Sequence, residues 1–390
     1  MNNKIDPVKQ HELWQGKIEV VSRVPVSSAE ELAVAYTPGV AKPCLEIERD
    51  YDKSFTLTRR GNLVAVITDG TAVLGLGDIG PAAAMPVMEG KCALFKAFAG
   101  IDAFPICVDS KDTDEIVKTI FNISKSFGGI NLEDISAPRC FEIEKRLKEI
   151  CDIPVFHDDQ HGTAVIAGAA LMNACRVVGK NFSEIRVVIN GAGAAGTAIA
   201  DGLLRLGVGD VTMCDIGGVL DSNDKKIDSA KRKLALRTNR AGIRGTLSDA
   251  LKGADAFIGV SAPGIVSGEM VESMAKKPIV FAMANPTPEI MPDVALKHGA
   301  AVVGTGRSDF PNQINNVLAF PGIFKGALKC RAADITDNMK TAASHALADF
   351  VGDRLSAEYI LPYAFEKGVA DAVAEAVIKS AKSDGIARIV

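Results

Sequence analysis

The 390-residue sequence lacks several features that would assign it to whole classes of protein. Lysine and arginine number 44 against 48 aspartates and glutamates, which gives a net charge of −4, and the basic residues are interspersed with acids. Without a basic patch the chain has no electrostatic field to hold a phosphate backbone, so we expect no nucleic-acid partner. Internal repeats and low-complexity segments are also missing from the sequence, which predicts globular structure throughout.

The cysteine spacing and the amino terminus exclude two further possibilities. None of the eight cysteines forms a C-x-x-C pair, so the spacing does not indicate a zinc knuckle or a dithiol redox site. The first fifteen residues lack the apolar core of a signal peptide, and the most apolar helical stretch, 164–172, is predicted to be too short to cross a bilayer. We therefore expect a cytoplasmic protein with no membrane partner, while an organelle stays compatible if a transit peptide has been removed.

Short apolar runs alternate along the chain with longer segments of helical periodicity. This pattern predicts an α/β fold, with a Rossmann-type doubly wound parallel sheet domain and a smaller α/β N-terminal domain. The chain is longer than one hydrophobic core usually allows, so we place a catalytic and substrate domain over 1–160 and a nucleotide-binding domain over 161–390. The helices after Pro321 could pack on either domain. The predicted strands cover 63–68, 104–109, 154–156, 186–189, 211–214, 256–260, 279–282 and 301–304, and the predicted helices cover 113–126, 163–178, 195–206 and 336–351.

Two segments, 75–80 and 191–196, match the G-x-G-x-x-G pattern. Only the second directly follows a predicted strand and opens an alanine-rich helix, so that its backbone N–H groups would face a pyrophosphate. In the first, Asp78 would repel a phosphate, and we interpret that segment as a structural or substrate-side turn. The predicted dinucleotide-binding residues are therefore Gly191, Ala192, Gly193, Ala194, Ala195 and Gly196.

Asp215 follows the next predicted strand, where the ribose hydroxyls of a dinucleotide would lie. A carboxylate accepts hydrogen bonds from a free 2′-hydroxyl and repels a 2′-phosphate, which favours NAD over NADP. NADP stays an alternative, because Lys225 or Lys226 could bring a positive charge to the phosphate. The other interpretation of Asp215 is a solvated turn residue.

Two pairs of adjacent acids, Glu133 with Asp134 and Asp158 with Asp159, lie at the edges of apolar segments. Buried carboxylates are costly without a cation between them, and such hard oxygen ligands suit Mg²⁺ or Mn²⁺ better than zinc. Taken alone, each pair is also compatible with a helix N-cap or a solvated face. Asp159 in particular could cap a helix that begins near Gly162.

These segments and several others together resemble the malic enzyme family in its short, bacterial-type form, over nearly the whole chain. The resemblance implies the oxidative decarboxylation of L-malate to pyruvate and carbon dioxide, with reduction of NAD or NADP. It further implies that Glu133, Asp134 and Asp159 hold a divalent metal, Mg²⁺ or Mn²⁺. The matching motifs are AYTPGVA at 35–41, TDG at 68–70, GLGDIG at 75–80, MEGK at 88–91, LED at 132–134, HDDQHGTA at 157–164, the glycines of 191–196, ANPT at 284–287, QINNV at 313–317 and FPG at 320–322.

The resemblance also implies catalytic roles for individual residues. Lys91 would accept the proton of the malate C2 hydroxyl, Asp158 would orient Lys91 or relay its proton, and Tyr36 would protonate C3 of the enol. In isolation, Lys91 would rather be interpreted as a helix-surface lysine and Tyr36 as a packed ring beside a turn, but the assembled pattern argues against both. The asparagines expected near the substrate carboxylate and the nicotinamide are Asn285, Asn315 and Asn316, of which Asn285 would also contact the cofactor.

One segment departs from the larger family members, which have a carboxylate-clamping arginine in the loop after Gly70. This chain has Thr71, Ala72 and Val73 there. We hypothesise that the turn 75–77, together with Asn285 and Asn316, replaces that arginine, and that a residue from a second subunit could add to them. A homodimer is the expected assembly.

Three other functions stay open at this point. A malolactic enzyme would convert malate to lactate at the same kind of site, and an amino-acid dehydrogenase would pair a lysine with a nucleotide domain but need no metal. A catalytically silent dinucleotide sensor is a third alternative, against which the presence of Tyr36, Lys91 and the metal-binding carboxylates argues.

Overall fold

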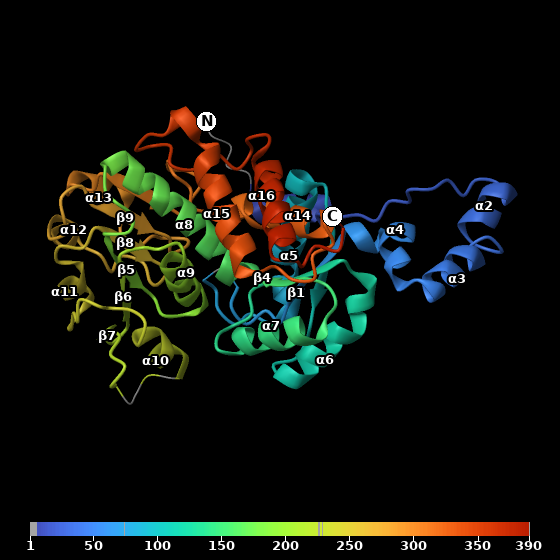
Figure 1. Cartoon of the computed structure of the whole chain (residues 1–390), viewed down its shortest axis with the longest axis horizontal. Coiled ribbons are helices and arrows are strands. Elements are labelled where there is room, and N and C mark those ends of the chain that lie inside the picture. The colour runs from blue at the N-terminus through green and yellow to red at the C-terminus, as the bar shows by residue number, and fades with distance from the viewer. Residues whose placement is uncertain (1–5, 74, 225–226, 228, 390) are drawn as a thin grey trace.

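The computed structural model describes residues 6–73, 75–224, 227 and 229–389 of the chain. Its body contains two sheets, built from successive parts of the sequence, and a helical arm projects from one end (Figure 1). The predicted α/β class, with a Rossmann-type sheet and an N-terminal α/β part, is confirmed.

The first sheet is entirely parallel and has the strand order β2-β1-β3-β4. Alternate residues of β1 enter two different cores because successive side chains of a strand point to opposite faces. Val64 and Val66 pack with the side chains of α5, whereas Ala65 and Ile67 pack with those of α6 and α7. The elements of this part are β1 (Leu63–Thr68), α5 (Pro81–Ala99), β2 (Asp102–Cys107), α6 (Thr113–Ile123), η3 (Ser124–Ser126), β3 (Gly129–Leu132), α7 (Arg139–Ile150) and β4 (Val155–His157).

The second sheet has the order β10-β9-β8-β5-β6-β7, with all neighbours parallel except the antiparallel pair β6 and β7. From β5 the strand order runs outward in both directions, and dinucleotides bind in the crevice at such a switch point. The elements are β5 (Arg186–Asn190), α9 (Ala194–Arg205), β6 (Asp210–Asp215), β7 (Gly218–Val219), α10 (Ser229–Ala235), α11 (Leu247–Leu251), β8 (Ala256–Gly259), α12 (Gly268–Glu272), β9 (Ile279–Ala282), α13 (Pro292–Lys297) and β10 (Val302–Thr305).

Helix α8 (Asp158–Val178) begins at the first sheet and packs along the second (Figure 1). The sequence interpretation underestimated its length: it has 21 residues and is the single described helix that is long and apolar enough to cross a membrane. However, 78% of its most apolar window is buried inside the protein. Such burial is typical of the core helix of a globular domain.

The C-terminal helices contact both parts of the body. Helices α14 (Phe320–Lys329) and α16 (Val369–Ser383) pack on α5, whereas α15 (Asp337–Phe350) packs on α8. The rings of Phe320 and Phe324 lie 4.8 and 5.3 Å from the ring of Phe95 in α5. These helices therefore complete the core of the N-terminal part although they follow the Rossmann strands in sequence. Between β10 and α14 lies the short helix η4 (Asn316–Leu318).

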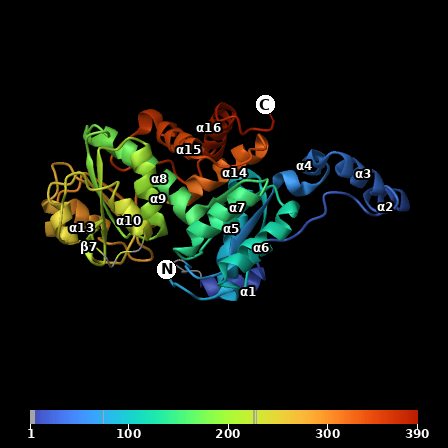
Figure 2. The same cartoon turned by 60° about the horizontal axis from the view of Figure 1, so that its bottom comes forward.

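Before β1 the chain forms a series of short helices, part of which leaves the body. Helix α1 (Pro7–Trp14) lies at the lower edge of the body in Figure 2. Helices α2 (Ala29–Ala35) and α3 (Ala41–Arg49) lie far out to one side (Figures 1 and 2). Neither α2 nor α3 has a buried residue. We call residues 18–50 the N-terminal arm. The chain returns to the body through η1 (Tyr51–Lys53), α4 (Ser54–Leu57) and η2 (Arg59–Asn62).

Candidate active site

The site is centred on Lys91, a buried lysine of α5. Its Nζ lies 2.6 Å from Oδ2 of Asp158 and 2.8 Å from Oε1 of Glu133. The same nitrogen lies 4.3 Å from the centre of the Phe320 ring, so the ammonium is enclosed by two carboxylates and an aromatic face. This environment contradicts the interpretation of Lys91 as a helix-surface lysine.

The acidic residues converge because they follow two neighbouring parallel strands. Glu133 and Asp134 come directly after β3, and Asp158 and Asp159 come directly after β4, so both pairs lie at the same edge of the sheet. Carboxylate oxygens of Glu133, Asp134 and Asp159 lie within 4.8 Å of one another. The structure therefore brings the three predicted metal ligands and Lys91 into one cluster, as the sequence analysis expected.

The backbone fixes the distance between the two acid pairs. Asp134 has a φ of +54°, an uncommon conformation for a residue with a side chain, and its N–H donates a 2.7 Å hydrogen bond to Oδ2 of Asp159. The alternative interpretation of Asp159 as a helix cap is wrong. Helix α8 already begins at Asp158, and its N-cap residue, His157, makes no side-chain capping bond.

The cluster carries an excess of negative charge. Burial raises the pKa of Glu133 and of Asp158 to about 7 and that of Asp159 to about 6, and Lys91 only partly opposes this effect. For Lys91, burial lowers the pKa, but attraction to Asp158, Glu133 and Asp159 outweighs burial and raises the pKa above its ordinary value. In this state Lys91 is a stably protonated ammonium.

The predicted asparagines lie around this cluster in different ways. A Cβ atom added to Gly162 in α8 would lie 1.8 Å from Oδ1 of Asp158 and 3.1 Å from Cβ of Asn316, so both residues lie against this position of the helix. Asn315 has a structural contact, because its Oδ1 accepts a 3.0 Å hydrogen bond from the N–H of Val317 and caps η4. Asn285 is exposed in the loop after β9.

The first glycine motif lies against the Asn285 loop. Gly75 has a φ of +78°, and a Cβ atom there would lie 2.8 Å from the carbonyl oxygen of Asn285. The turn of the N-terminal part thus touches the Rossmann part beside the site. In the loop where larger relatives have an arginine, Thr71 Oγ1 and Asp69 Oδ2 instead accept hydrogen bonds of 3.1 and 2.8 Å from Arg139.

The second glycine motif has the geometry of a dinucleotide loop. Gly191 has a φ of +111°, and a Cβ atom on Gly196 would lie 1.8 Å from the carbonyl oxygen of Gly191. Among the described residues other than its chain neighbours, none has an atom within 4 Å of the corresponding position at Gly193, which leaves space for a pyrophosphate to approach the backbone. Helix α9 begins at Ala194 without a side-chain cap, so its first N–H groups can bind phosphate oxygens.

Asp215 ends β6 and has a partner that the sequence interpretation missed. Its Oδ2 lies 2.6 Å from Nζ of Lys231, which projects from α10. This ion pair contradicts the interpretation of Asp215 as a merely solvated turn residue. Lys225 and Lys226, suggested as phosphate partners, lie outside the described residues.

Tyr36 is the predicted catalytic residue that a single chain does not bring to the site. It directly follows α2, at the far end of the N-terminal arm, and 66% of it is exposed (Figures 1 and 2). The alternative interpretation of Tyr36 as a packed ring beside a turn is wrong, because most of the residue is exposed in the part of the chain that the structure describes.

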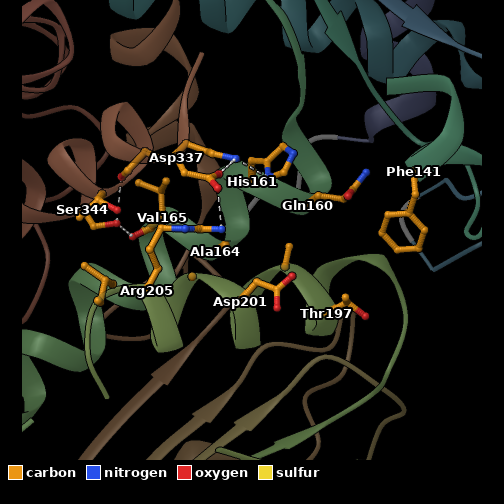
Figure 3. A pocket seen from close by; sticks show the side chains of 15 residues that line it. Phe141, Gln160, His161, Ala164, Val165, Thr197, Asp201, Arg205, Asp337 and Ser344 are labelled. Atoms are coloured by element: carbon orange, nitrogen blue, oxygen red, sulfur yellow. Dashed lines mark hydrogen bonds and ion pairs between the residues drawn. The ribbon is translucent and has the colours of Figure 1, made fainter. Parts of the chain in front are cut away.

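A second polar network behind the acidic cluster was also missed. His161 Nε2 lies 2.9 Å from Oε2 of Glu144, and His161 Nδ1 lies 3.3 Å from Nζ of Lys340. Lys340 and Arg205 both pair with Asp337, beside a cavity of about 150 Å³ between α8, α9 and α15 (Figure 3). Burial raises the pKa of Glu144, but His161 outweighs it and lowers that pKa to about 2. The one signal of this network in the sequence is the i, i+3 spacing of Asp337 and Lys340, which is compatible with an ion pair on a helix.

Known protein families match both parts of the chain. The malic enzyme N-terminal domain matches residues 15–148, and the malic enzyme NAD-binding domain matches residues 160–382. The bifunctional malic/malolactic enzyme of Bacillus subtilis is 55% identical over 391 residues, which cover 100% of this chain and 95% of that protein. The NAD-dependent malic enzyme of Geobacillus stearothermophilus is 55% identical over 96% of this chain and 78% of its own length. The NADP-dependent malic enzyme of Escherichia coli is 48% identical over 95% of this chain, which spans 51% of that relative.

Solved structures agree with these matches. The NAD-dependent malic enzyme from Thermotoga maritima superposes with a TM-score of 0.93 at 48% identity, covering 96% of this chain and 99% of that one. The malic enzyme from Pyrococcus horikoshii has a TM-score of 0.94 at 46% identity, covering 98% and 92%. With both domains matched and the buried lysine, the acidic cluster and the dinucleotide loop in place, the chain belongs to the malic enzyme family of nicotinamide-dependent oxidoreductases.

Proposed function

We propose that this enzyme oxidises and decarboxylates L-malate to pyruvate and carbon dioxide and reduces NAD or NADP. The observation that carries the proposal is the position of Lys91, a buried amine held between two carboxylates beside a cluster of three possible metal ligands. An amine that takes a proton from a hydroxyl group needs neighbouring charges that adjust its pKa. The dinucleotide-binding loop of the same chain would hold the nicotinamide dinucleotide that accepts the hydride. We propose that the catalytic and substrate domain covers 1–160 and that the nucleotide-binding domain covers 161–390. We also propose that the protein is cytoplasmic.

The acidic cluster fits a divalent metal. Four carboxylates, of Glu133, Asp134, Asp158 and Asp159, face one ammonium group, and a divalent cation would offset the excess negative charge. Three oxygen ligands with room for substrate oxygens suit Mg²⁺ or Mn²⁺. Once bound, such an ion would polarise the C2 oxygen of malate and stabilise negative charge on it.

The protein residues then move the protons. A divalent cation that offset the carboxylates would lower the pKa of Lys91, so that its ammonium would release a proton to solvent. The neutral amine would then accept the proton of the C2 hydroxyl while hydride leaves C2 for the nicotinamide. Asp158, bonded to Lys91 Nζ, stabilises the ammonium that forms. The C3–C4 bond breaks as carbon dioxide leaves, and Tyr36 supplies the proton that C3 then takes.

Because Tyr36 lies far from Lys91 in its own chain, we propose a homodimer in which the arm of one subunit supplies Tyr36 to the other. Helices α2 and α3 have seven and nine residues and bury no side chain, and such short helices are unstable without packing. The arm also exposes an unusual number of large apolar residues, which a second copy would cover. They are Val20, Val21, Val24, Val26, Leu32, Val34, Tyr36, Val40 and Leu45.

The substrate carboxylate needs a partner other than the missing arginine. The contact of Gly75 with the Asn285 carbonyl supports our hypothesis that the 75–77 turn, Asn285 and Asn316 bind it together. Asn285→Ala should therefore raise the KM for malate. An unchanged KM would contradict this assignment.

For the cofactor, we propose that NAD is favoured and that NADP is used to a measurable extent. Asp215 can accept hydrogen bonds from the adenosine ribose, which favours NAD. Lys231 beside it offsets the repulsion of a 2′-phosphate and could bind that phosphate directly.

The decisive assay mixes the purified protein with L-malate and Mn²⁺ and offers NAD and NADP separately. Nicotinamide reduction with equal formation of pyruvate supports the proposal. Lactate without net reduction would instead indicate malolactic chemistry, the second candidate, which the name of the Bacillus subtilis relative favours. Amino-acid oxidation that survives a chelator would indicate an amino-acid dehydrogenase, and absence of turnover would indicate a dinucleotide sensor.

A further inference from the structure

Glu289 is a fully buried acid in the second sheet's part of the chain, and it is not one of the carboxylates around Lys91. It lies in the segment between β9 and α13, and 0% of it is exposed. The same segment contains Asn285, which is exposed. A buried polar side chain needs hydrogen-bond partners, and the partners of Glu289 show which parts of the chain it holds together.

The carboxylate of Glu289 joins two loops. Its Oε1 accepts hydrogen bonds of 2.8 Å from the N–H and 3.1 Å from the hydroxyl of Ser261, in the loop after β8. Its Oε2 accepts a 3.0 Å hydrogen bond from the N–H of Ala284, in the loop after β9. One side chain therefore holds these two loops at a fixed distance from each other.

The backbone of the same segment holds the far end of the loop after β8. The carbonyl oxygen of Pro288 accepts a 3.1 Å hydrogen bond from the N–H of Gly264. The carbonyl oxygen of Glu289 accepts a 3.0 Å hydrogen bond from the N–H of Val266. A Cβ atom on Gly259, the last residue of β8, would lie 2.3 Å from the carboxyl carbon of Glu289, so this glycine leaves the space that the carboxylate occupies.

Both loops lie beside residues that we assign to the active site. The carbonyl oxygen of Val260, directly before Ser261, would lie 2.5 Å from a Cβ atom on Gly191, the first glycine of the dinucleotide loop. Ala284 directly precedes Asn285, the residue proposed to bind the substrate carboxylate and the cofactor. The bonds of Glu289 therefore connect the surroundings of the dinucleotide loop with the Asn285 loop.

The donors around Glu289 require a group that accepts hydrogen bonds at both of its polar atoms. Nδ2 of Asn190 donates a 2.8 Å hydrogen bond to the Ser261 hydroxyl, which leaves the proton of that hydroxyl for Glu289. The groups that face the two oxygens are thus all donors, and a carboxylate only accepts. In a glutamine, an NH2 group would face one of these donors and leave it unpaired in the interior.

We propose that Glu289 is a positioning residue that orders the loops after β8 and β9 for the dinucleotide and the substrate. The inference rests on the proposed binding of a nicotinamide dinucleotide at 191–196 and on the proposed role of Asn285. Because Glu289 is fully buried, it acts through Ser261 and Ala284 rather than by contact with a ligand. Loops that are ordered beforehand bind a ligand at a lower cost in conformational entropy.

The first test measures the Kd for NAD of the wild-type protein and of Glu289→Gln by fluorescence. The Kd of the variant should be about tenfold higher or more, because an unpaired donor replaces a hydrogen bond to a carboxylate and frees one loop. A variant that folds and keeps its Kd within about twofold, while the wild-type protein binds NAD, would overturn the inference and leave the proposed function intact. If the wild-type protein binds no dinucleotide, the proposed function fails and this inference fails with it.

Asp255→Asn is the matched control. The Asp255 carboxylate accepts a 2.9 Å hydrogen bond from the N–H of Arg186 and lies 2.8 Å from Nζ of Lys180, where β5 and β8 begin, at the opposite edge of the same sheet. This variant should lower the melting temperature but leave the Kd for NAD within about twofold. An equal rise of the Kd in both variants would indicate a general loss of folded structure and would also overturn the inference.

Amide hydrogen exchange followed by NMR tests the two loops without a ligand. In the wild-type protein the amides of Ser261 and Ala284 should exchange at least about a hundredfold more slowly than those of an unstructured peptide. In Glu289→Gln at least one of the two should exchange about tenfold faster or more, while the amides of β6 keep their rates. If that variant does not fold, the wild-type measurement decides, and unprotected amides at both positions would overturn the inference.

Discussion

Mixing subunits that carry Tyr36→Phe with subunits that carry Lys91→Ala should restore malate oxidation that neither variant shows alone. In the proposed homodimer each site takes Lys91 from one chain and Tyr36 from the other. A mixed dimer therefore has one intact site and one site that lacks both groups. If both groups came from one chain, every site in the mixture would be defective.

The expected recovery follows from counting sites. When equal amounts exchange at random, half of the dimers are mixed and half of their sites are intact, so activity should reach about one quarter of the wild-type value. The structure also supplies a control pair. Lys91 and Asp158 lie 2.6 Å apart within one chain, so mixing Lys91→Ala with Asp158→Asn should recover no activity.

The assay follows nicotinamide reduction with malate and Mn²⁺ after subunit exchange. Different affinity tags on the two variants allow the mixed dimer to be purified, and its activity should be about half of that of the wild-type dimer. If the doubly tagged dimer of Tyr36→Phe and Lys91→Ala forms but stays inactive, the assignment of Tyr36 to the partner's site is refuted.

Three further changes test other parts of the site. Saturating Mn²⁺ should stabilise the wild-type protein by about 2 to 3 kcal/mol. Asp134→Asn should remove most of that stabilisation, because it takes away one of three anionic ligands. Calorimetric melting curves with and without Mn²⁺ measure both effects. Lys231→Met should lower kcat/KM for NADP about tenfold or more and leave the value for NAD within about threefold, since only NADP carries a 2′-phosphate. An equal loss with both cofactors would contradict the assignment. Gly196→Ala should raise the Kd for NAD at least about tenfold, because a Cβ atom 1.8 Å from the carbonyl oxygen of Gly191 would force the loop to move. Fluorescence measurements of equilibrium binding give the Kd. An unchanged Kd would refute the close packing.

Most of the buried framework could be predicted from the sequence because apolar runs and glycines report local structure directly. Strands β1 and β9 have the predicted bounds, and the others that were predicted differ at their ends. Strand β3 was missed because the polar Asn131 interrupts its short apolar run, and β7 was missed because it has only two residues. Helix α8 begins five residues earlier than predicted, since acids that look like a solvated loop are instead buried at its first turn.

The site was predictable where its residues belong to ordered motifs and unpredictable where it depends on distant contacts. Lys91 and the carboxylates of Glu133 and Asp158 meet as expected, because the ends of parallel strands share one edge. No local pattern could place Tyr36, because its position depends on how the arm leaves the body. The pairing of Lys231 with Asp215 was likewise invisible, since it joins a helix and a strand that are sixteen residues apart.

Gly162 is necessary for the position of the Asp158 carboxylate although it carries no functional group. The missing methyl group at this position is the space that the Asp158 carboxylate occupies. Alanine there would turn the carboxylate away from Lys91 without removing any acid, base or ligand. In the proposed reaction, the absence of a side chain at residue 162 is therefore as necessary as the side chains that would exchange protons.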